Sequence, residues 1–471
     1  MPQSLTPSLL DHTLRIVARR YRLQDLPDPT PGMQESDPST ALAIAIEQAR
    51  ASLARGEAPA AAPRRLFIGA LACLIRTALR EPNGDAVFQA MVLRHRAPRV
   101  REHASLCAHA GRDRRAVRTA VDALAHPGKR RSLSPGPIPD ALAQLHAAAS
   151  SASWTVLADQ AARLLAMPDA VVDTPIRQGL VRLQNDPALA RLKRLDELAS
   201  DPLVQRYQAL WDRQGPRPGS AQAAEQGATS RRRGDAVEAM AATTLDTLAR
   251  VLAKDEGEPY RVATSLRVPS SMPGDPERAK TEWDVALLRQ AGDAGAAHAG
   301  AARAGAAWEV RLLVEAKASV DAATTDLPRL VRGLRLLAKA DEDTAYAFGS
   351  RQGTMLLHGA SLSALKTDEA ALAATVLYFC DAPAETVPRL LGAASRMQLL
   401  SAPASLEFAS RLADGQDAQA LALEPIWLEL VASPRWGAVL NQYPLLRQVR
   451  ALMVHPDDLR AAIDAASRRA A

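Results

Sequence analysis

The chain has 471 residues, of which 47% are apolar but only 4% aromatic, and its formal net charge is +6. This length allows two or three domains, and a core built mainly from Ala, Leu and Val favours helices. Three widely spaced cysteines, Cys73, Cys107 and Cys380, argue against a disulfide scaffold and a structural zinc site.

The N-terminal segment has charges throughout and lacks the apolar centre of a signal peptide. No stretch reaches the roughly 18 uncharged apolar residues of a membrane-spanning helix. We therefore expect a soluble cytoplasmic protein. The positive charge permits a polyanionic partner, although an excess of arginine over lysine also fits a bias in the base composition of the gene.

Four regions are expected along the chain. Residues 1–213 show apolar residues at three- and four-residue spacing and predict an all-helical domain. Residues 214–230 are rich in Gly, Pro, Ala and Gln and predict a flexible linker. Residues 231–365 mix helix and strand, and residues 366–471 return to helices, the first expected over 368–379.

The mixed region predicts an α+β fold with a small mixed sheet. A low-complexity loop over 291–307 separates the second strand from the third, and Thr325 or Asp326 caps the second helix. In chain order, the expected elements are a helix over 233–253, strands over 260–268, 281–289 and 308–317, a helix over 325–340, and short strands over 344–350 and 354–358.

A charged pair closes the third expected strand. Only seven of the 58 Lys and Arg residues are lysine, and the one Glu-x-Lys sequence is Glu315-Ala316-Lys317. Because a strand alternates faces with period two, Glu315 and Lys317 share a face. Asp284 lies on the preceding strand. An acid and an ammonium at a strand end, with a second acid beside them, can hold a divalent metal and a water next to a phosphate.

This order of elements resembles the PD-(D/E)XK nuclease superfamily. The order is helix, three strands, helix and strand, with Asp284 on the second strand and Glu315-Ala316-Lys317 on the third. The resemblance covers about residues 234–365 and implies a restriction-endonuclease-like αβββαβ core flanked by the all-α N-terminal and C-terminal regions. Trp283 stands before Asp284, where the superfamily often has proline.

The resemblance also implies roles for individual residues. Asp284 and Glu315 would bind Mg²⁺ (or Mn²⁺), with the backbone carbonyl of Ala316 as a further ligand. Lys317 would orient or activate the attacking water, and Glu238 on the first helix would contact the metal directly or through water. Mg²⁺ prefers such oxygen ligands, lowers the pKa of its water and neutralises developing charge.

Arginines near this core are candidates for DNA binding. The superfamily often places a basic residue on the helix after Glu-x-Lys, where Arg332 is the preferred candidate and Arg329 and Arg335 are available. Arg231, Arg232 and Arg233 precede the first core helix, and a denser basic stretch spans residues 94–118. Either group could follow a phosphate backbone, or could be an ordinary solvated helix surface.

The expected activity is metal-dependent hydrolysis of DNA phosphodiester bonds, in restriction or anti-phage defence, mobile-element function or repair. Two other classes remain open: a catalytically silent nucleic-acid-binding module, and a helical interaction scaffold. Asp284 as a surface acid and Glu315–Lys317 as an edge-strand pair would fit either of these. The helical regions would recognise substrate, form a homo-oligomer or bind a partner protein.

Overall fold

The computed structural model describes residues 8–131, 135–167, 174–216, 219–291, 307–369 and 371–470. Helices predominate in this part of the chain and one small mixed sheet accompanies them, which confirms the predicted α+β class. The predicted low-complexity loop falls mainly on residues 292–306, which lie outside the described residues.

Two compact units share the chain, and neither is continuous in sequence. Within the described residues, the first comprises those up to 71, 219–398 and 427–470, and the second comprises 72–216 and 399–426. One boundary between the units lies between residues 216 and 219, close to the predicted boundary at 213, whereas the predicted N-terminal domain is divided after residue 71 and the predicted boundary at 365 lies inside the first unit. Segments near both ends of the chain belong to the unit that contains the sheet, and apolar spacing within a helix does not reveal which distant element its apolar face will cover.

The mixed region folds in the predicted order of helix, three strands, helix and two strands. The second helix begins with Pro328 in its first turn, where a missing backbone N–H costs nothing. The elements are α13 (Ala221–Glu256), β1 (Tyr260–Arg267), β2 (Glu282–Gln290), β3 (Trp308–Lys317), α15 (Leu327–Leu337), β4 (Ala345–Ser350) and β5 (Gly353–His358).

The sheet also contains two strands that the sequence did not predict. β1, β2 and β3 form an antiparallel meander, with the β4–β5 hairpin on the other side of β1. β6 (Val376–Cys380) lies parallel to β3, and β7 (Met453–Val454) lies parallel to β6. The predicted helix over 368–379 is therefore wrong. β6 is entirely buried, and a short apolar run without alternation suits a buried helix as well as a buried strand.

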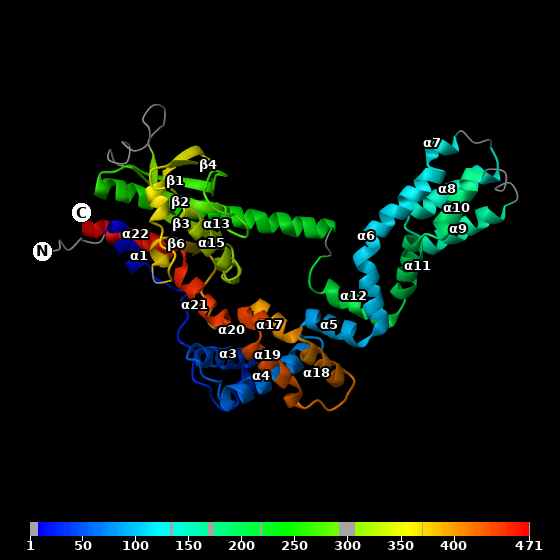
Figure 1. Ribbon diagram of the computed structural model, residues 1–471, viewed down its shortest axis with the longest axis horizontal. Helices are drawn as coiled ribbons and strands as arrows, with labels where there is room; N and C mark the ends of the chain where they lie inside the picture. Colours follow the sequence, from blue (N-terminus) through cyan, green and yellow to red (C-terminus); the bar gives the residue numbers. More distant parts are fainter. Residues whose placement is uncertain are drawn as a thin grey trace. The chain divides into compact units, whose positions relative to one another are not determined.

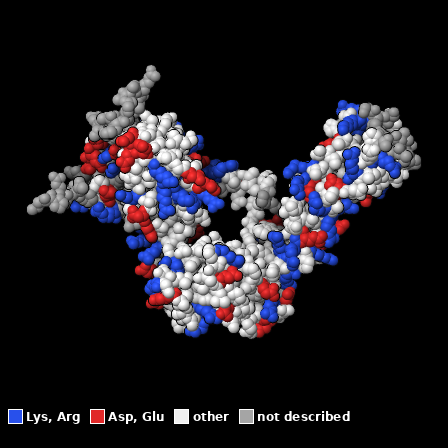
Figure 2. All heavy atoms as spheres, viewed as in Figure 1, with Lys and Arg blue, Asp and Glu red and all other residues white. Residues whose placement is uncertain are grey.

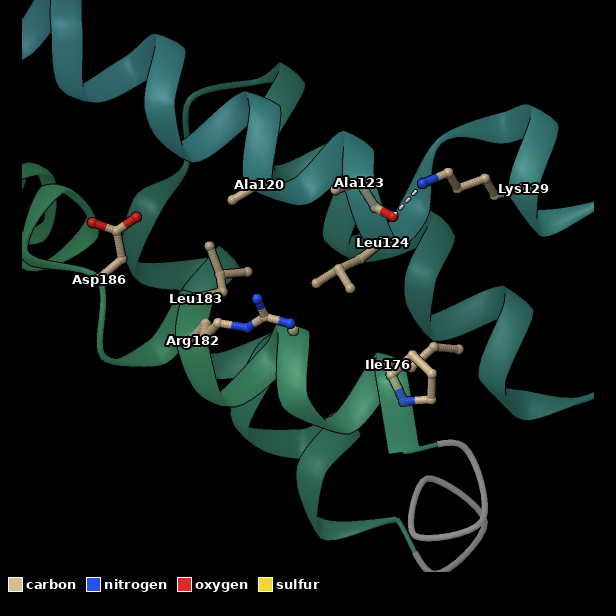
Figure 3. A pocket seen from close by; sticks show the side chains of 10 residues that line it. Ala120, Ala123, Leu124, Lys129, Ile176, Arg182, Leu183 and Asp186 are labelled. Atoms are coloured by element: carbon tan, nitrogen blue, oxygen red, sulfur yellow. Dashed lines mark hydrogen bonds between the residues drawn. The ribbon is translucent and has the colours of Figure 1, made fainter.

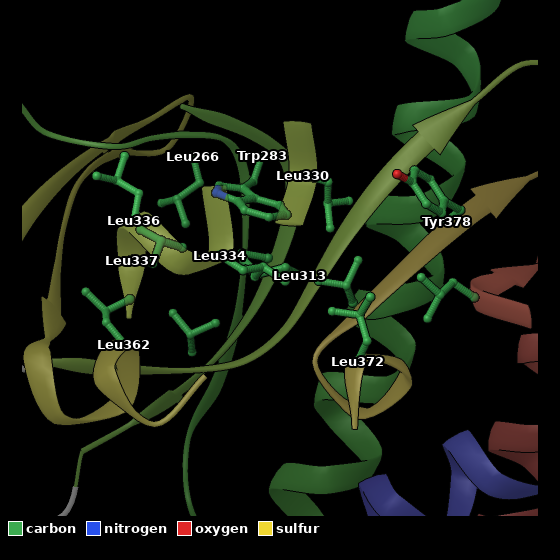
Figure 4. Packing of buried hydrophobic residues seen from close by; sticks show 14 of the residues in the cluster. Leu266, Trp283, Leu313, Leu330, Leu334, Leu336, Leu337, Leu362, Leu372 and Tyr378 are labelled. Atoms are coloured by element: carbon green, nitrogen blue, oxygen red, sulfur yellow. The ribbon is translucent and has the colours of Figure 1, made fainter. Parts of the chain in front are cut away.

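Helices of the first unit cover both faces of the sheet. On one face, Leu334 of α15 packs with Trp283 of β2 and Leu313 of β3 in a continuous apolar cluster (Figure 4). On the other face, α13 packs with α1 (Leu9–Ile16) and α22 (Pro456–Ala470). Each end of the chain thus supplies a helix to the α13 face of the sheet.

The predicted flexible linker is partly helical. α13 begins at Ala221 as one long helix (Figure 1), and Ser220 caps it by accepting a hydrogen bond from the N–H of Ala223. Its buried residues begin only at Val237. The exposed first part has no apolar stripe, but its Ala, Gln, Glu and Arg residues have high helix propensity, which an apolar-period criterion does not register.

The second unit is all-helical, as predicted for most of its sequence. Aspartates cap several of its helices, among them Asp85, Asp186 and Asp201. Its helices are α5 (Ala86–Arg96), α6 (Pro98–Ala125), α7 (Pro127–Arg130), α8 (Pro137–Ser150), α9 (Trp154–Ala166), α10 (Thr174–Gln184), α11 (Pro187–Ala199), α12 (Pro202–Asp212) and α18 (Pro403–Ala413).

Further helices complete the chain. The first unit adds α2 (Met33–Ser36), α3 (Pro38–Ala54), α16 (Gly359–Ser363), α20 (Gly437–Leu440) and α21 (Gln442–Leu452). The chain passes between the units within α4 (Ala61–Leu79), α17 (Ala393–Leu400) and α19 (Glu424–Ala432). None of the described helices is long and apolar enough to cross a membrane. The cysteines Cys73, Cys107 and Cys380 are free.

Candidate functional site

The strand register places Asp284 and Glu315 opposite each other. Val285 on β2 pairs with Val314 on β3, so the next step along the antiparallel pair brings Asp284 to Glu315. Residues at opposite positions point to the same face of a sheet. Asp284 also accepts a hydrogen bond at Oδ2 from the N–H of Ala316, at 2.8 Å, where the β2–β3 ladder ends.

Glu315 is fully buried, and two ammonium groups contact one of its oxygens. Lys280 Nζ lies 2.6 Å from Oε2 and Lys317 Nζ lies 3.2 Å from the same atom. Oε1 is buried and has no hydrogen-bond partner among the described residues. Burial, with a smaller effect of Asp284, raises the pKa of Glu315 to about 7, although both lysines oppose the rise. This carboxylate therefore has less positive charge around it than its burial demands.

Lys317 lies in a fixed position at the end of β3. Its Nζ contacts Asp326 at 3.1 Å as well as Glu315, and lies 6.0 Å from the centre of the Tyr378 ring on β6. Burial lowers the pKa of Lys317, but the carboxylates of Glu315, Asp326 and Asp284 outweigh burial and raise it overall. Lys317 is thus a charged ammonium group.

Three residues of this cluster were not predicted from the sequence as site residues. Lys280 lies in the connection before β2, where a lysine is normally solvated, and Tyr378 lies in the strand that was predicted as helix. Thr325 or Asp326 was expected to cap α15, and Asp326 is the residue concerned. It occupies the cap position but makes no capping hydrogen bond, and its carboxylate instead contacts Lys317. The scarcity of lysine was the one signal that could have drawn attention to Lys280.

Glu238 lies on α13 near this cluster but has another partner. Its Oε1 is 3.5 Å from Arg351 Nη2 in the β4–β5 turn. Burial raises the pKa of Glu238, Arg351 opposes the rise, and the charge of Asp284 adds to it. Glu238 and Asp284 are therefore within electrostatic reach of each other, although the described contacts include no direct bond between them.

The arginines of α15 lie on its exposed surface and make no described contact with the Glu315 cluster. Arg329, Arg332 and Arg335 are exposed. The Nε of Arg332 donates to the backbone carbonyl of Arg278, in the connection between β1 and β2. In the described part of the chain, these three side chains make no hydrogen bond or ion pair with Glu315 or Asp284, so the structure does not bring the preferred candidate Arg332 into the cluster.

Arg233 is the basic candidate on α13 with a defined place at the sheet. Its guanidinium donates to both oxygens of Asp381, at 2.6 and 2.8 Å, and Arg231, Arg232 and Arg233 are all exposed. Asp381 directly follows β6, and Cys380 of β6 pairs with Lys317. The carboxyl ends of two parallel strands thus place Arg233 at the same edge as Lys317, the edge where ligands bind in many open sheets.

The arginine-rich stretch over 94–118 belongs to the second unit and is partly neutralised. Arg96 pairs with Asp414 and Arg99 with Asp201. On the face of this unit that Figure 2 shows, Lys and Arg side chains are interspersed with Asp and Glu. Exposed arginines of α6 remain at positions 112, 114, 115 and 118.

Two cavities of about 530 and 540 Å³ also lie in the second unit. In the first, Lys129 turns to the backbone carbonyl of Ala123 at 2.7 Å, and Leu124, Arg182 and Asp186 also line the cavity (Figure 3). The second is lined by four arginines together with Glu81, Gln89 and apolar side chains; the arginines are Arg76, Arg80, Arg96 and Arg206. Neither cavity is lined by residues of the Glu315 cluster.

The predicted metal ligands Asp284 and Glu315 are not part of a larger metal-binding group in the described residues. Across the described ranges there is no group of three or more His, Cys, Asp and Glu side chains suited to a metal ion. Among the side chains around Glu315, Asp284 faces it across the strand pair, and the Asp326 carboxylate shares Lys317 with it. Comparisons with protein-family models, curated proteins and solved structures found no match to the chain. Function must therefore be inferred from these side chains and their chemistry.

Proposed function

We propose that the chain hydrolyses phosphodiester bonds of DNA, with Mg²⁺ or Mn²⁺ as cofactor, at the site of Asp284, Glu315 and Lys317. One observation carries the proposal: the register of β2 and β3 sets Asp284 opposite Glu315, and Lys317 contacts Glu315 from the same strand. Two carboxylates and an ammonium group lie together at the end of a strand, a set that suits a divalent cation and a phosphate.

The connectivity supports the resemblance to the PD-(D/E)XK superfamily. Helix α13, the meander β1–β2–β3 and helix α15 follow one another, and β6 lies parallel to β3. β6 would then be the final strand of the αβββαβ core, in place of the strands over 344–350 and 354–358. On this assignment, the β4–β5 hairpin is an addition between α15 and the last core strand.

The residues present fit a hard divalent cation. Glu315 Oε1 is a buried oxygen without a hydrogen-bond partner among the described residues, and Asp284 faces it from the neighbouring strand. The carbonyl of Ala316 is a suitable third ligand, because the N–H and C=O of one strand residue point to the same side and its N–H meets Asp284. When bound, Mg²⁺ lowers the pKa of water and neutralises charge on the phosphate.

Lys317 would bind the scissile phosphate or the attacking water as a charged donor. Its raised pKa keeps the ammonium protonated, so it serves as a positive charge and not as a general base. Asp326 holds the ammonium in place at 3.1 Å. Glu238 would add negative charge near Asp284, and Arg233 would contact the DNA backbone at the same edge of the sheet.

A cleavage assay tests this proposal. Plasmid, linear duplex and single-stranded DNA are incubated with the protein in Mg²⁺, Mn²⁺ or EDTA, beside Asp284→Asn. The matched control is Glu309→Gln, which removes an acid of β3 whose partner is Arg289. We expect metal-dependent cleavage by the wild type and by Glu309→Gln, and none by Asp284→Asn. Equal cleavage by wild type and Asp284→Asn would contradict the assignment.

A second candidate is a nucleic-acid-binding module without catalytic activity. The observation that favours it is the contact of the Lys280 ammonium with Glu315 at 2.6 Å, since an internal cation already neutralises part of this carboxylate. Salt-sensitive binding of DNA without cleavage under any metal condition would support this candidate against the first.

A further inference from the structure

Lys280 is a buried ammonium group that the proposed reaction does not use. It is 7% exposed, although it lies in the connection between β1 and β2. A buried ammonium is costly unless a counter-ion and hydrogen bonds compensate its charge. Glu315 supplies that charge at 2.6 Å, the shorter of the two lysine contacts at Oε2.

Helix α15 fixes the backbone of Lys280. The Lys280 N–H donates to the carbonyl of Arg329 at 3.1 Å. A Cβ atom at Gly333 would lie 2.7 Å from the Lys280 carbonyl oxygen and 2.9 Å from its Cβ, so only glycine permits this approach of helix and connection. Two residues before Lys280, the backbone carbonyl of Arg278 accepts a hydrogen bond from Arg332 Nε of α15. The position of Lys280 is therefore set by the fold.

The two lysines differ in how they divide their charge. Lys317 contacts both Glu315 and Asp326, whereas the salt bridge described for Lys280 is with Glu315. Lys280 is thus dedicated to one carboxylate, and that carboxylate is a ligand of the proposed metal site. A divalent cation near Glu315 would meet the repulsion of this ammonium.

We infer that Lys280 is the resident counter-ion of Glu315 and competes with a divalent cation for that carboxylate. The inference rests on the proposed function in taking Glu315 as a metal ligand. Without metal, Lys280 compensates the buried charge. With metal, the two cations share it, so each weakens the hold of the other. Replacing Lys280 by a neutral residue should therefore strengthen metal binding while it destabilises the metal-free fold.

Binding of Mn²⁺ to the full-length protein tests the inference, with free Mn²⁺ measured by electron paramagnetic resonance. The variants are Lys280→Met and Lys280→Gln, the second of which keeps a polar end in the buried position. Lys254→Met removes an exposed lysine of α13 and serves as the matched control. We expect Mn²⁺ to bind the Lys280 variants about tenfold more tightly or better, and the control like the wild type.

Thermal unfolding gives a second readout. In EDTA the Lys280 variants should unfold at lower temperature than the wild type, and Mn²⁺ should raise their unfolding temperature by more. Adding Asp284→Asn to Lys280→Met should remove the gain in affinity, which would assign the gain to this site.

Each outcome decides between the two claims. Tighter binding by the variants supports the inference, even if the wild type binds no Mn²⁺ and cleaves no DNA, in which case the proposed function alone fails. Wild-type binding that the Lys280 variants match or weaken overturns the inference and leaves the proposed function standing. Absence of Mn²⁺ binding in every protein overturns both.

Discussion

Glu315 concentrates the chemistry of this chain at a single carboxylate. It is fully buried, faces Asp284, and meets two ammonium groups at one oxygen while the other oxygen has no hydrogen-bond partner among the described residues. A buried charge of this kind is costly for stability. We propose that the buried carboxylate is retained because its Oε1, the oxygen without a hydrogen-bond partner among the described residues, can bind a cation.

The pH dependence of stability should reveal this cost. The pKa of Glu315 is raised from 4.5 to about 7 by folding, so the folded state binds the proton more tightly than the unfolded state. The contribution of protonated Glu315 to the free energy of unfolding is therefore fully present below about pH 4.5 and is lost as pH rises through about 7. At about 1.4 kcal/mol per pKa unit, the loss is about 3 kcal/mol.

Urea unfolding of Glu315→Gln in EDTA checks the size and sign of this effect. Glutamine cannot ionise, so the variant should gain about 3 kcal/mol relative to the wild type between pH 4.5 and pH 8. The control Glu309→Gln, which alters a partly exposed carboxylate, should show no comparable gain. A difference between Glu315→Gln and wild type that does not vary with pH would show that folding leaves Glu315 unperturbed.

At this scale the sequence related Glu315 to Lys317 but missed their partners. The two-residue alternation of one strand sets Glu315 and Lys317 on the same face, and Asp284 was chosen because it lies on the preceding strand. Lys280 and Tyr378 could not be identified, since only the fold brings the β1–β2 connection and β6 to Glu315. The preferred candidate Arg332 was chosen for its place on α15, but helical spacing does not tell which side of that helix faces the cluster.

At the scale of elements, α15 supports the cluster from outside the sheet. It supplies Asp326 to Lys317, and Gly333 brings it against the backbone of Lys280. This close approach depends on the absence of a side chain at one helical position. The site thus requires a particular packing of α15 against the connection that precedes β2.

Alanine substitutions of two helical glycines distinguish the effect of close helix packing on stability from the effect of helix propensity. Gly333→Ala should destabilise the fold by about 1–3 kcal/mol, because its Cβ would overlap the Lys280 backbone. Gly234→Ala in α13 meets nothing within 4 Å and should stabilise the fold by about 0.5–1 kcal/mol. Chemical denaturation measures both. Stabilisation by both substitutions would mean that α15 does not approach Lys280 closely.

Elements with a clear period were predictable from the sequence, and those without one were not. β1, β2, β3 and α15 were expected within a few residues of their observed bounds. The first part of α13 lacks an apolar stripe and was expected to be a flexible linker. β6 has no alternation because β3 and β7 flank it and both of its faces are buried.

At the scale of the whole molecule, the unit that carries the site is assembled from distant parts of the chain. β6 and β7 extend the sheet beside β3, and α1 and α22 cover the α13 face. The sequence indicated a separate domain over 231–365, but that segment lacks all four of these elements. Its apolar faces would be exposed to solvent in isolation.

A fragment of residues 231–365 should therefore fail to fold, whereas the full chain unfolds cooperatively. Circular dichroism and one-dimensional NMR of the two proteins check this expectation. We expect poor dispersion and no cooperative melting for the fragment. A fragment with a sharp thermal transition would show that β6, β7 and the terminal helices are dispensable for the core.

The rate of plasmid cleavage in Mg²⁺ by Lys317→Met, beside Lys254→Met, tests whether the Glu315 cluster is a catalytic site. The first variant removes the ammonium that contacts Glu315, and the second removes an exposed lysine of α13. We expect wild-type cleavage by Lys254→Met and a loss of about 100-fold or more in Lys317→Met, with both proteins folded. Equal rates for the two variants would contradict the proposed site.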